Sequence, residues 1–394
     1  MSTPVAAGVG ALVMQAYRDA HESLPSPETV RAILSGTAQN LGYPANKQGG
    51  GRVDAYEAYL AAIDKRVYPD VSYLSTDPLM PGDTFATTID FTQPIDDAWT
   101  YTFETVDTLM LSGSGAVGEI LFLPDFTVPD GVDFLEVTLK YDPEVNFGPV
   151  KDYDGSQWTD ARVNTVLYRI EDENENITIN YAYSHTNQQW MQARVSPGGY
   201  RIRGDVLGYG LAPGTSIEFD VQITMMHRVE WPMVSVAGMG NTAEVTVTVP
   251  STAYPGTYSG FISATAGEDE VQIPVNVNVA AQLGHTFGLP FHVAFEPRGY
   301  MSGDWQYVPL YVPPGEKSIT LIADWTEENA DFDFFAVTPT GRRVEAGSFA
   351  PSAPVLLPSG GGKRWWTGTG GTAEVLTLKH PKSGYWLLGI HNTF

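Results

Sequence analysis

The sequence predicts a mainly β protein, with tandem antiparallel β-sandwiches that follow a short helical segment. Three observations predict this. From about Val67 onward, polar and apolar residues alternate along the chain. Pro-Gly and related turns separate the alternating runs, and no helical pattern lies between them. Aromatic residues reach 12%, with 40 Gly and 28 Pro, which is typical of short strands joined by turns.

The first 66 residues carry a helical pattern. The run from Met1 to Met14 is apolar on nearly all sides, so we expect a helix that is buried rather than lying at the surface. A second helix is expected from Ser26-Pro27-Glu28, because Ser caps, Pro suits the first helical position and Glu complements the helix dipole. The segment from Gly49 to Ala58 predicts a glycine turn that leads into a last short helix.

Alternating runs predict the strands of the β region. Each run has one apolar and one polar side, as expected of a strand with one buried face. The clearest runs are Thr84–Phe91, Leu135–Tyr141, Ser216–Ile223, Glu244–Val249 and Val271–Val279.

An internal repeat organises this region. Val128–Leu139 parallels Val312–Leu321, and Pro197–Gly204 parallels Pro381–Gly389. The spacing from Pro129 to Tyr200 is 71 residues, and that from Pro313 to Tyr385 is 72. Similar segments at matching spacing predict two copies of one sandwich.

The repeat suggests three regions. Residues 1–66 form the helical segment, residues 67–281 a sandwich with the first repeat inserted at about 116–228, and residues 282–394 the second repeat. The first copy continues past Gly204 to a strand ending near Met225, whereas five residues follow Gly389 in the second. We therefore expect the second copy to be truncated, lacking its last strand.

Charge and cysteine content exclude several classes of partner. The chain has 22 basic and 46 acidic residues, a net charge of −24, which disfavours nucleic acid and anionic membranes. It has no cysteine, which excludes disulfides, thiolate metal sites and a cysteine nucleophile. The uncharged opening from Pro4 to Met14 is too short for a membrane span.

The start of the chain resembles the subtilisin-like serine proteases. Met1-Ser-Thr-Pro-Val-Ala-Ala-Gly8 is similar to the segment that follows the nucleophile in the family signature Gly-Thr-Ser-Met-[Ala/Ser]-[Ser/Thr]-Pro-x-x-Ala-Gly. Thr37-Ala38 is similar to the Thr-Ala that ends a later helix of the family, and Gly49–Ala55 to its Gly-x-Gly-x-[Val/Ile]-[Asp/Asn]-Ala element. The resemblance covers about the first 60 residues.

The resemblance places the catalytic serine immediately before Met1, with the family's Asp, His and oxyanion-binding Asn further upstream. This chain therefore has no predicted catalytic residue and should hydrolyse nothing by itself. Ser2 matches a position after the nucleophile and has no predicted base beside it.

The implied parent is a secreted or cell-surface endopeptidase that acts on proteins or peptides by acyl transfer, without a cofactor in the chemistry. Residues 1–66 would be the helical remnant of its α/β catalytic domain. The second repeat resembles the pre-peptidase C-terminal type of jelly roll, and the residues flanking the first repeat suggest a fibronectin-III-like sandwich. These β-domains would stabilise or tether the enzyme, or recruit its substrate.

Two acidic clusters are candidate structural calcium sites. Asp152, Asp154 and Asp160 lie near a glycine turn, and Asp331 with Asp333 lies early in the second repeat. Oxygen ligands at short spacing suit Ca²⁺, although neither cluster matches a full calcium loop. The alternative is a solvated acidic turn.

A second function class remains open, a non-catalytic extracellular adhesion or carbohydrate-binding protein with a cell-surface or glycan partner. Aromatic side chains could form a sugar-binding face on its strands. Because adjacent residues on a strand point to opposite faces, half of each pair is expected in the core. The candidates are Trp305 and Tyr307, Trp365 and Trp366, and Tyr385 and Trp386.

Overall fold

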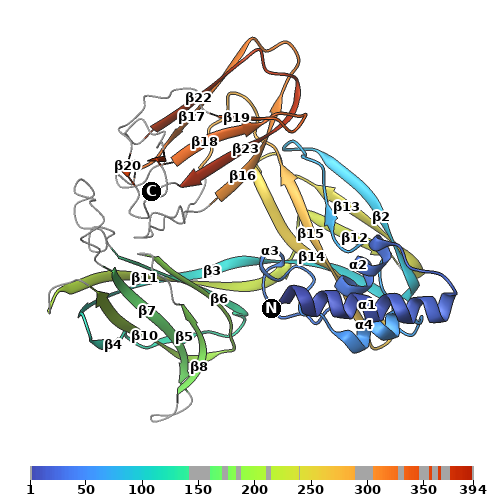
Figure 1. Ribbon diagram of the computed structural model, residues 1–394, viewed down its shortest axis with the longest axis horizontal. Coiled ribbons are helices and arrows are strands. Elements are labelled where there is room, and N and C mark those ends of the chain that lie inside the picture. Colours follow the sequence, from blue (N-terminus) through green and yellow to red (C-terminus); the bar gives the residue numbers. More distant parts are fainter. Residues whose placement is uncertain are drawn as a thin grey trace. The chain divides into compact units, whose positions relative to one another are not determined.

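The computed structural model describes residues 2–141, 160–170, 176–182, 188–209, 214–238, 240–288, 305–326, 332–345, 355–356, 363–364 and 373–392. The fold is mainly β, which confirms the predicted fold class (Figure 1). The chain divides into two compact units, residues 1–104 with 228–281 and residues 105–227 with 282–394. Strands β3 (Asp97–Ala116) and β11 (Ser216–Glu230) contribute residues to both units.

Four helices open the first unit, and two of them begin at a side-chain cap. The Ser26 hydroxyl accepts a hydrogen bond from the Thr29 N–H at 3.0 Å, which confirms the expected start of the second helix. The Asp54 carboxylate accepts from the N–H groups of Tyr56 and Glu57 and caps the last helix. The helices are α1 (Ser2–His21), α2 (Pro27–Gly36), α3 (Ala45–Gln48) and α4 (Ala55–Ala62).

The expectation that α1 is buried on all sides is wrong. Val9, Val13 and Ala16 face a small core shared with α2 and α4. Val5 and Leu12 border this stripe and are nevertheless 63% and 54% exposed. The described residues thus cover only part of the apolar surface of α1.

A β-sandwich completes the first unit. One layer contains β1, β15, β14 and the first part of β3 in that order, and the other contains β12, β13 and β2. β1 runs parallel to β15, whereas β14 is antiparallel to β15 and β3, and β13 is antiparallel to β12 and β2. Ile89, Val245 and Ile273 are buried between the layers. The further strand bounds are β1 (Leu74–Ser75), β2 (Thr84–Ile95), β12 (Val234–Gly238), β13 (Gly240–Thr248), β14 (Gly256–Ala266) and β15 (Asp269–Val279).

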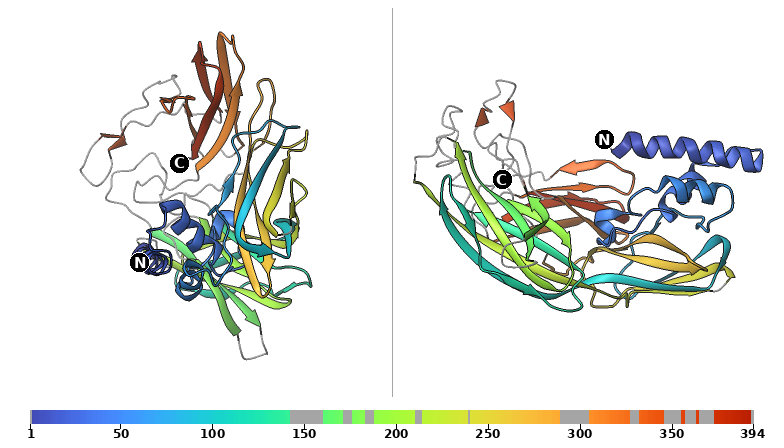
Figure 2. Two further views of the ribbon diagram at one scale, coloured as in Figure 1. Left: turned by 90° about the vertical axis from the view of Figure 1, so that its right-hand side faces the viewer. Right: turned by 90° about the horizontal axis from the view of Figure 1, so that it is seen from below.

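The helices lie together on one side of this sandwich (Figure 2). Ala45 of α3 packs in one cluster with Tyr101 of β3 and Phe261 of β14. The Ser35 hydroxyl donates to the carbonyl of Ser72 at 2.7 Å, which adds a polar tie between α2 and the start of the β region. The helical segment is therefore packed onto the sandwich of its own unit.

Residues 105–227 form a second sandwich. β11, β6 and β9 are neighbours in one layer, and β4, β10, β7 and β8 form the other, with β5 also paired to β10. Leu139, Leu167 and Ile223 are buried in its core. The strands are β4 (Ile120–Phe122), β5 (Phe126–Val128), β6 (Phe134–Tyr141), β7 (Asp160–Ile170), β8 (Asn176–Ala182), β9 (Gln188–Arg194) and β10 (Gly198–Tyr209).

Residues 282–394 also form strands where they are described. β16, β23, β18 and β19 are neighbours in one sheet, β17 pairs with β22, and β20 pairs with β21. The bounds are β16 (Trp305–Val312), β17 (Ser318–Asp324), β18 (Phe332–Val337), β19 (Arg343–Glu345), β20 (Val355–Leu356), β21 (Lys363–Arg364), β22 (Ala373–Lys379) and β23 (Gly384–Asn392).

The two sequence repeats share a pairing register. Gly198 lies opposite Val128 in the first repeat, and Gly384 lies opposite Val312 in the second. Two residues after each glycine, Tyr200 and Trp386 are buried. Tyr200 Oη donates to the carbonyl four residues earlier at 2.9 Å, and Trp386 Nε1 does the same at 2.8 Å.

The structural equivalent of Tyr200 is therefore Trp386. The sequence repeat instead aligned Tyr200 with Tyr385, and that alignment is wrong by one residue. The error arose because both segments contain Gly-Tyr, whereas the shared feature is a buried ring whose polar atom reaches a local carbonyl.

Candidate functional site

The three sequence elements that resemble a subtilisin-like domain lie close together in the helical segment. Val9 and Val13 of α1 share a core with Ile33 of α2 and Ala58 of α4. A Cβ atom placed on Gly10 would lie 3.9 Å from a methyl of Val30, which is an ordinary van der Waals contact, so the packing of α1 against α2 does not require a glycine at this position.

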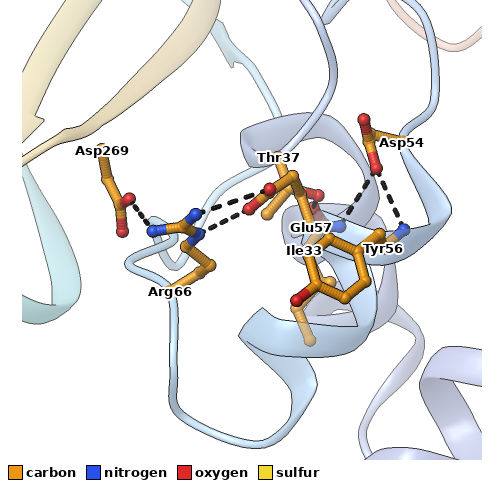
Figure 3. A network of polar contacts seen from close by, with 7 residues as sticks. All are labelled: Ile33, Thr37, Asp54, Tyr56, Glu57, Arg66 and Asp269. Atoms are coloured by element: carbon orange, nitrogen blue, oxygen red, sulfur yellow. Dashed lines mark hydrogen bonds and ion pairs between the residues drawn. The ribbon is translucent and has the colours of Figure 1, made fainter.

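Thr37 ends α2. Its N–H donates to the Ile33 carbonyl at 3.1 Å, and its hydroxyl donates to the same oxygen at 2.7 Å. Both donors serve the end of the helix, so the Thr of the Thr-Ala element has a local structural role (Figure 3).

The glycine element pairs with the residues just after Thr-Ala. Gln39 and Arg52 form an antiparallel bridge, with N–H to carbonyl distances of 2.8 and 3.0 Å. Gly51 beside it has a φ of +116°, and a Cβ there would collide with the carbonyl of Gln39. Only glycine fits this backbone, which explains the residue type at this position.

An ion-pair network joins α4 to the sandwich. Arg66 Nε lies 2.5 Å from Oε2 of Glu57 in α4, and its Nη1 pairs with Oδ1 of Asp269 at the start of β15 (Figure 3). The hydrogen bond with Glu57 raises the pKa of Arg66, with a further contribution from Asp269, so the guanidinium stays charged. Sequence reasoning missed this network, because Asp269 is separated from Arg66 by 203 positions and no motif links them.

Ser2 lies at the start of α1. Among the described histidines, His21 contacts the carbonyl of Ala62 at 3.2 Å and Asp64 at 3.6 Å. Ala62 ends α4 and Asp64 follows it shortly after, so this histidine helps to hold α1 against α4. The prediction that residues 1–66 supply no catalytic residue stays a prediction.

The calcium candidates are only partly described. Asp152, Asp154 and Asp331 lie outside the described residues. Asp160 opens β7 opposite Tyr209, and Asp333 lies in β18 opposite His391. Within the described part of the chain, no group of three or more acidic or histidine side chains could hold a metal ion. Calcium binding stays a prediction.

Some of the aromatic candidates for a sugar-binding face are exposed and others are buried. Tyr307 and Tyr385 are 49% and 36% exposed, and Trp386 is buried. Trp305 begins β16, and Trp365 and Trp366 lie outside the described residues. The pair Tyr385 and Trp386 confirms the expectation that neighbouring aromatics face opposite ways.

Comparisons with known proteins give no family assignment. No family model and no curated protein matches the chain. One solved structure that matches part of it is described as a family 123 glycoside hydrolase from Clostridium perfringens, studied for glycolipid glycan hydrolysis. The identity is 10% and the TM-score 0.14, over 52% of this chain and 23% of that one. None of the helices in the described residues is long and apolar enough to cross a membrane.

Proposed function

We propose that residues 1–66 are the C-terminal helical part of a subtilisin-like serine endopeptidase domain, and that the β-sandwiches are its C-terminal extensions. The parent protein would be secreted or held at the cell surface, and its substrates would be proteins or peptides. The reaction is peptide-bond hydrolysis by a Ser-His-Asp triad, which needs no cofactor in the chemistry.

The main support for the proposal is that the three motif elements lie together in one helical cluster. The apolar stripe of α1, the Thr37 end of α2 and the Gly49–Ala55 turn are separate in the sequence. They come together through the shared core around Val13 and through the bridge between Gln39 and Arg52. Each element has a local reason for its residue type, as expected if the whole segment is one structural unit rather than three chance matches.

The start of α1 is suited to lie beside a reacting serine. A helix N-terminus carries a partial positive charge, which stabilises an anion. The first turn of α1 holds no acidic residue that would neutralise this end. In the parent enzyme, it would support the nucleophile and the oxyanion that forms during acyl transfer.

Two exposed apolar residues of α1 support the same proposal. Val5 and Leu12 are seven positions apart, so they lie on one side of the helix, and they are 63% and 54% exposed. Isolated exposed apolar residues are ordinary, but two on one side, bordering a buried stripe, favour a further partner surface. In the proposed enzyme, the sheet of the catalytic domain covers this side.

A serine-reactive probe tests the proposal on the native protein. Protein isolated from the source cells is treated with a biotinylated fluorophosphonate, digested with trypsin and analysed by mass spectrometry. The first tryptic site in this chain is Arg18. We expect the label on a serine immediately before Met1, in a peptide that ends at Arg18.

Phenylmethylsulfonyl fluoride added before the probe is the control and should abolish labelling. A native protein that takes up no probe, or that carries it on Ser2 or on a serine of the β-domains, would contradict the proposal.

A further inference from the structure

One strand of the second repeat has an edge that is covered in the first repeat. In the first repeat, β6 lies between β9 and β11. In the second, β17 holds the position of β6 and pairs with β22, and no other described strand lies beside it. The other layers correspond, because β4, β10, β7 and β8 have the same order as β16, β23, β18 and β19. The described part of the second repeat therefore contains no counterpart of β11.

Backbone hydrogen bonds show that β6 and β17 have the same orientation in their sheets. The Val195 N–H donates to the Asp133 carbonyl at 3.1 Å, directly before β6. The His380 N–H donates to the Lys317 carbonyl at 2.8 Å, directly before β17. Asp133 and Lys317 each lie two residues after the glycine of the turn that leads into the strand. The two residues are therefore equivalent positions in the repeats.

This equivalence identifies the backbone groups at the open edge of β17. In an antiparallel sheet, alternate residues of a strand bond to one neighbour, and the residues between them bond to the other. Since Lys317 bonds towards β22, every second residue after it does so too. The N–H and C=O groups of the intervening residues face the open edge, as the equivalent groups of β6 face β11. These residues are Ser318, Thr320, Ile322 and Asp324.

Side chains of β17 are also less covered than their counterparts in β6. Val137 and Leu139 of β6 are 1% and 0% exposed. The equivalent residues of β17, Leu321 and Ala323, are only half-buried, and Ile322 on the outer face is 69% exposed. An open edge with an exposed β-branched side chain is a template for pairing with a further strand.

The sequence of β11 indicates which kind of strand fits this edge. Every second residue of β11 is apolar and buried in the core of the first sandwich. Its Asp220 lies opposite Lys140 of β6, and the position of Lys140 is held by Asp324 in β17. An acidic residue opposite Asp324 would be repelled, whereas a basic residue would be attracted. The buried residues of β11 are Ile217, Phe219, Val221, Ile223 and Met225.

We propose that the open edge of β17 binds an extended segment of a partner protein. The segment pairs antiparallel to β17, has an apolar residue at every second position and places a basic residue opposite Asp324. Main-chain hydrogen bonds would hold it and alternate side chains would select it, as in other cases of strand addition. A second copy of this chain is disfavoured, because it carries the same net charge of −24 and β17 contains no basic residue.

Fluorescence anisotropy with the full 394-residue chain tests the proposal. The probe is a fluorescein-labelled synthetic peptide with the sequence of residues 216–226 and the substitution Asp220→Lys. We expect saturable binding of this peptide. The peptide with Asp220 retained should bind about threefold more weakly or less, because it places two carboxylates opposite each other.

N-methylation of the peptide tests the register. In β11, the N–H groups of Gln222 and Thr224 face β6, and those of Val221 and Ile223 face away from it. N-methyl groups at Gln222 and Thr224 should weaken binding about tenfold or more, since two hydrogen bonds are lost. N-methyl groups at Val221 and Ile223 are the matched control and should leave the affinity unchanged.

Two proline variants of the protein test the edge itself. Thr320 of β17 and Thr377 of β22 lie opposite each other, both are exposed, and the N–H of each points away from the other strand. Proline at either position leaves the pairing of β17 with β22 intact. Thr320→Pro should weaken peptide binding about tenfold or more. Thr377→Pro changes the far edge of β22 and should leave binding unchanged.

The absence of saturable binding of the Asp220→Lys peptide would overturn the proposal. Equal weakening by the two N-methylation patterns would also overturn it. A dimer in light scattering that Thr320→Pro dissociates, and that takes up no peptide, would show instead that a second copy occupies the edge. None of these measurements depends on proteolysis, so they are separate from the test of the proposed protease.

Discussion

The guanidinium of Arg66 pairs with the carboxylate of Asp269, which joins the end of the helical segment to a strand 203 positions later. The same arginine pairs with Glu57 in α4. The side chains of Arg66 and Asp269 are 35% and 19% exposed, so this network is partly shielded from solvent. It is one of the contacts that make residues 1–66 a packed part of the first unit, rather than a separate tail.

Arg66→Ala should loosen this connection. We expect a loss of about 1 kcal/mol in the free energy of unfolding, the upper end for a solvent-accessible ion pair. Hydrogen exchange should show faster exchange in α4. Arg31→Ala is the matched control, because Arg31 and its partner Glu28 are 68% and 71% exposed and lie 3.8 Å apart. Equal losses from the two substitutions would argue against a specific role for Arg66.

Substitution by alanine should have opposite effects on stability at Gly51 and at Gly8. Gly51→Ala places a Cβ against the Gln39 carbonyl at a positive φ, and should cost about 1–3 kcal/mol of stability. Gly8 lies in α1, where an added Cβ would meet nothing within 4 Å, so Gly8→Ala should stabilise by about 0.5–1 kcal/mol. Urea unfolding of both variants measures the two effects. A Gly51→Ala protein as stable as the original would show that the turn has another conformation.

Stability should fall in alkaline solution as Tyr68 ionises. Burial raises the pKa of Tyr68 from 10.0 to about 12, with smaller contributions from Tyr17 and Asp64. In the unfolded chain this phenol ionises near its ordinary pKa. The buried, neutral phenol therefore makes its full contribution to the free energy of unfolding below pH 10, and this contribution is lost as the pH rises towards 12.

Urea unfolding at a series of pH values checks this, and Tyr68→Phe should show a shallower decline because it has no phenol to ionise. An identical pH dependence in the two proteins would rule out Tyr68 as the cause.

The equivalence of Tyr200 and Trp386 predicts parallel losses in the two repeats. Tyr200→Phe removes two hydrogen bonds, one donated to the Ser196 carbonyl and one accepted from the Ser196 N–H, and should cost about 1–2 kcal/mol. Trp386→Phe removes a hydrogen bond and part of a buried ring, so its cost should be greater. Tyr254→Phe is the control, since Tyr254 is 63% exposed. Thermal unfolding followed by circular dichroism separates these outcomes, and a neutral Tyr200→Phe would contradict the role given to its hydroxyl.

Local patterns in the sequence were enough to predict much of the fold. The alternating run Val271–Val279 lies within β15, and the capping signal at Ser26 marks the start of α2. These features depend on near neighbours in the chain, where side-chain period and capping chemistry act directly.

Features that depend on distant residues could not be predicted. The apolar run of α1 gave no sign that Val5 and Leu12 would be exposed, because burial depends on what packs around a helix. The guanidinium of Arg228 lies over the ring of Tyr101, although more than a hundred positions separate the two residues. No local sequence pattern predicts a contact between residues so far apart. The sequence analysis therefore selected other aromatic residues as candidates.

The most direct test of the central claim is to sequence the gene upstream of the Met1 codon in its natural source. We predict an open reading frame that encodes Gly-Thr-Ser immediately before Met1, with the Asp and His motifs of a subtilisin-like domain further upstream. An in-frame stop codon, or an unrelated coding sequence at that position, would contradict the assignment of residues 1–66 to such a domain.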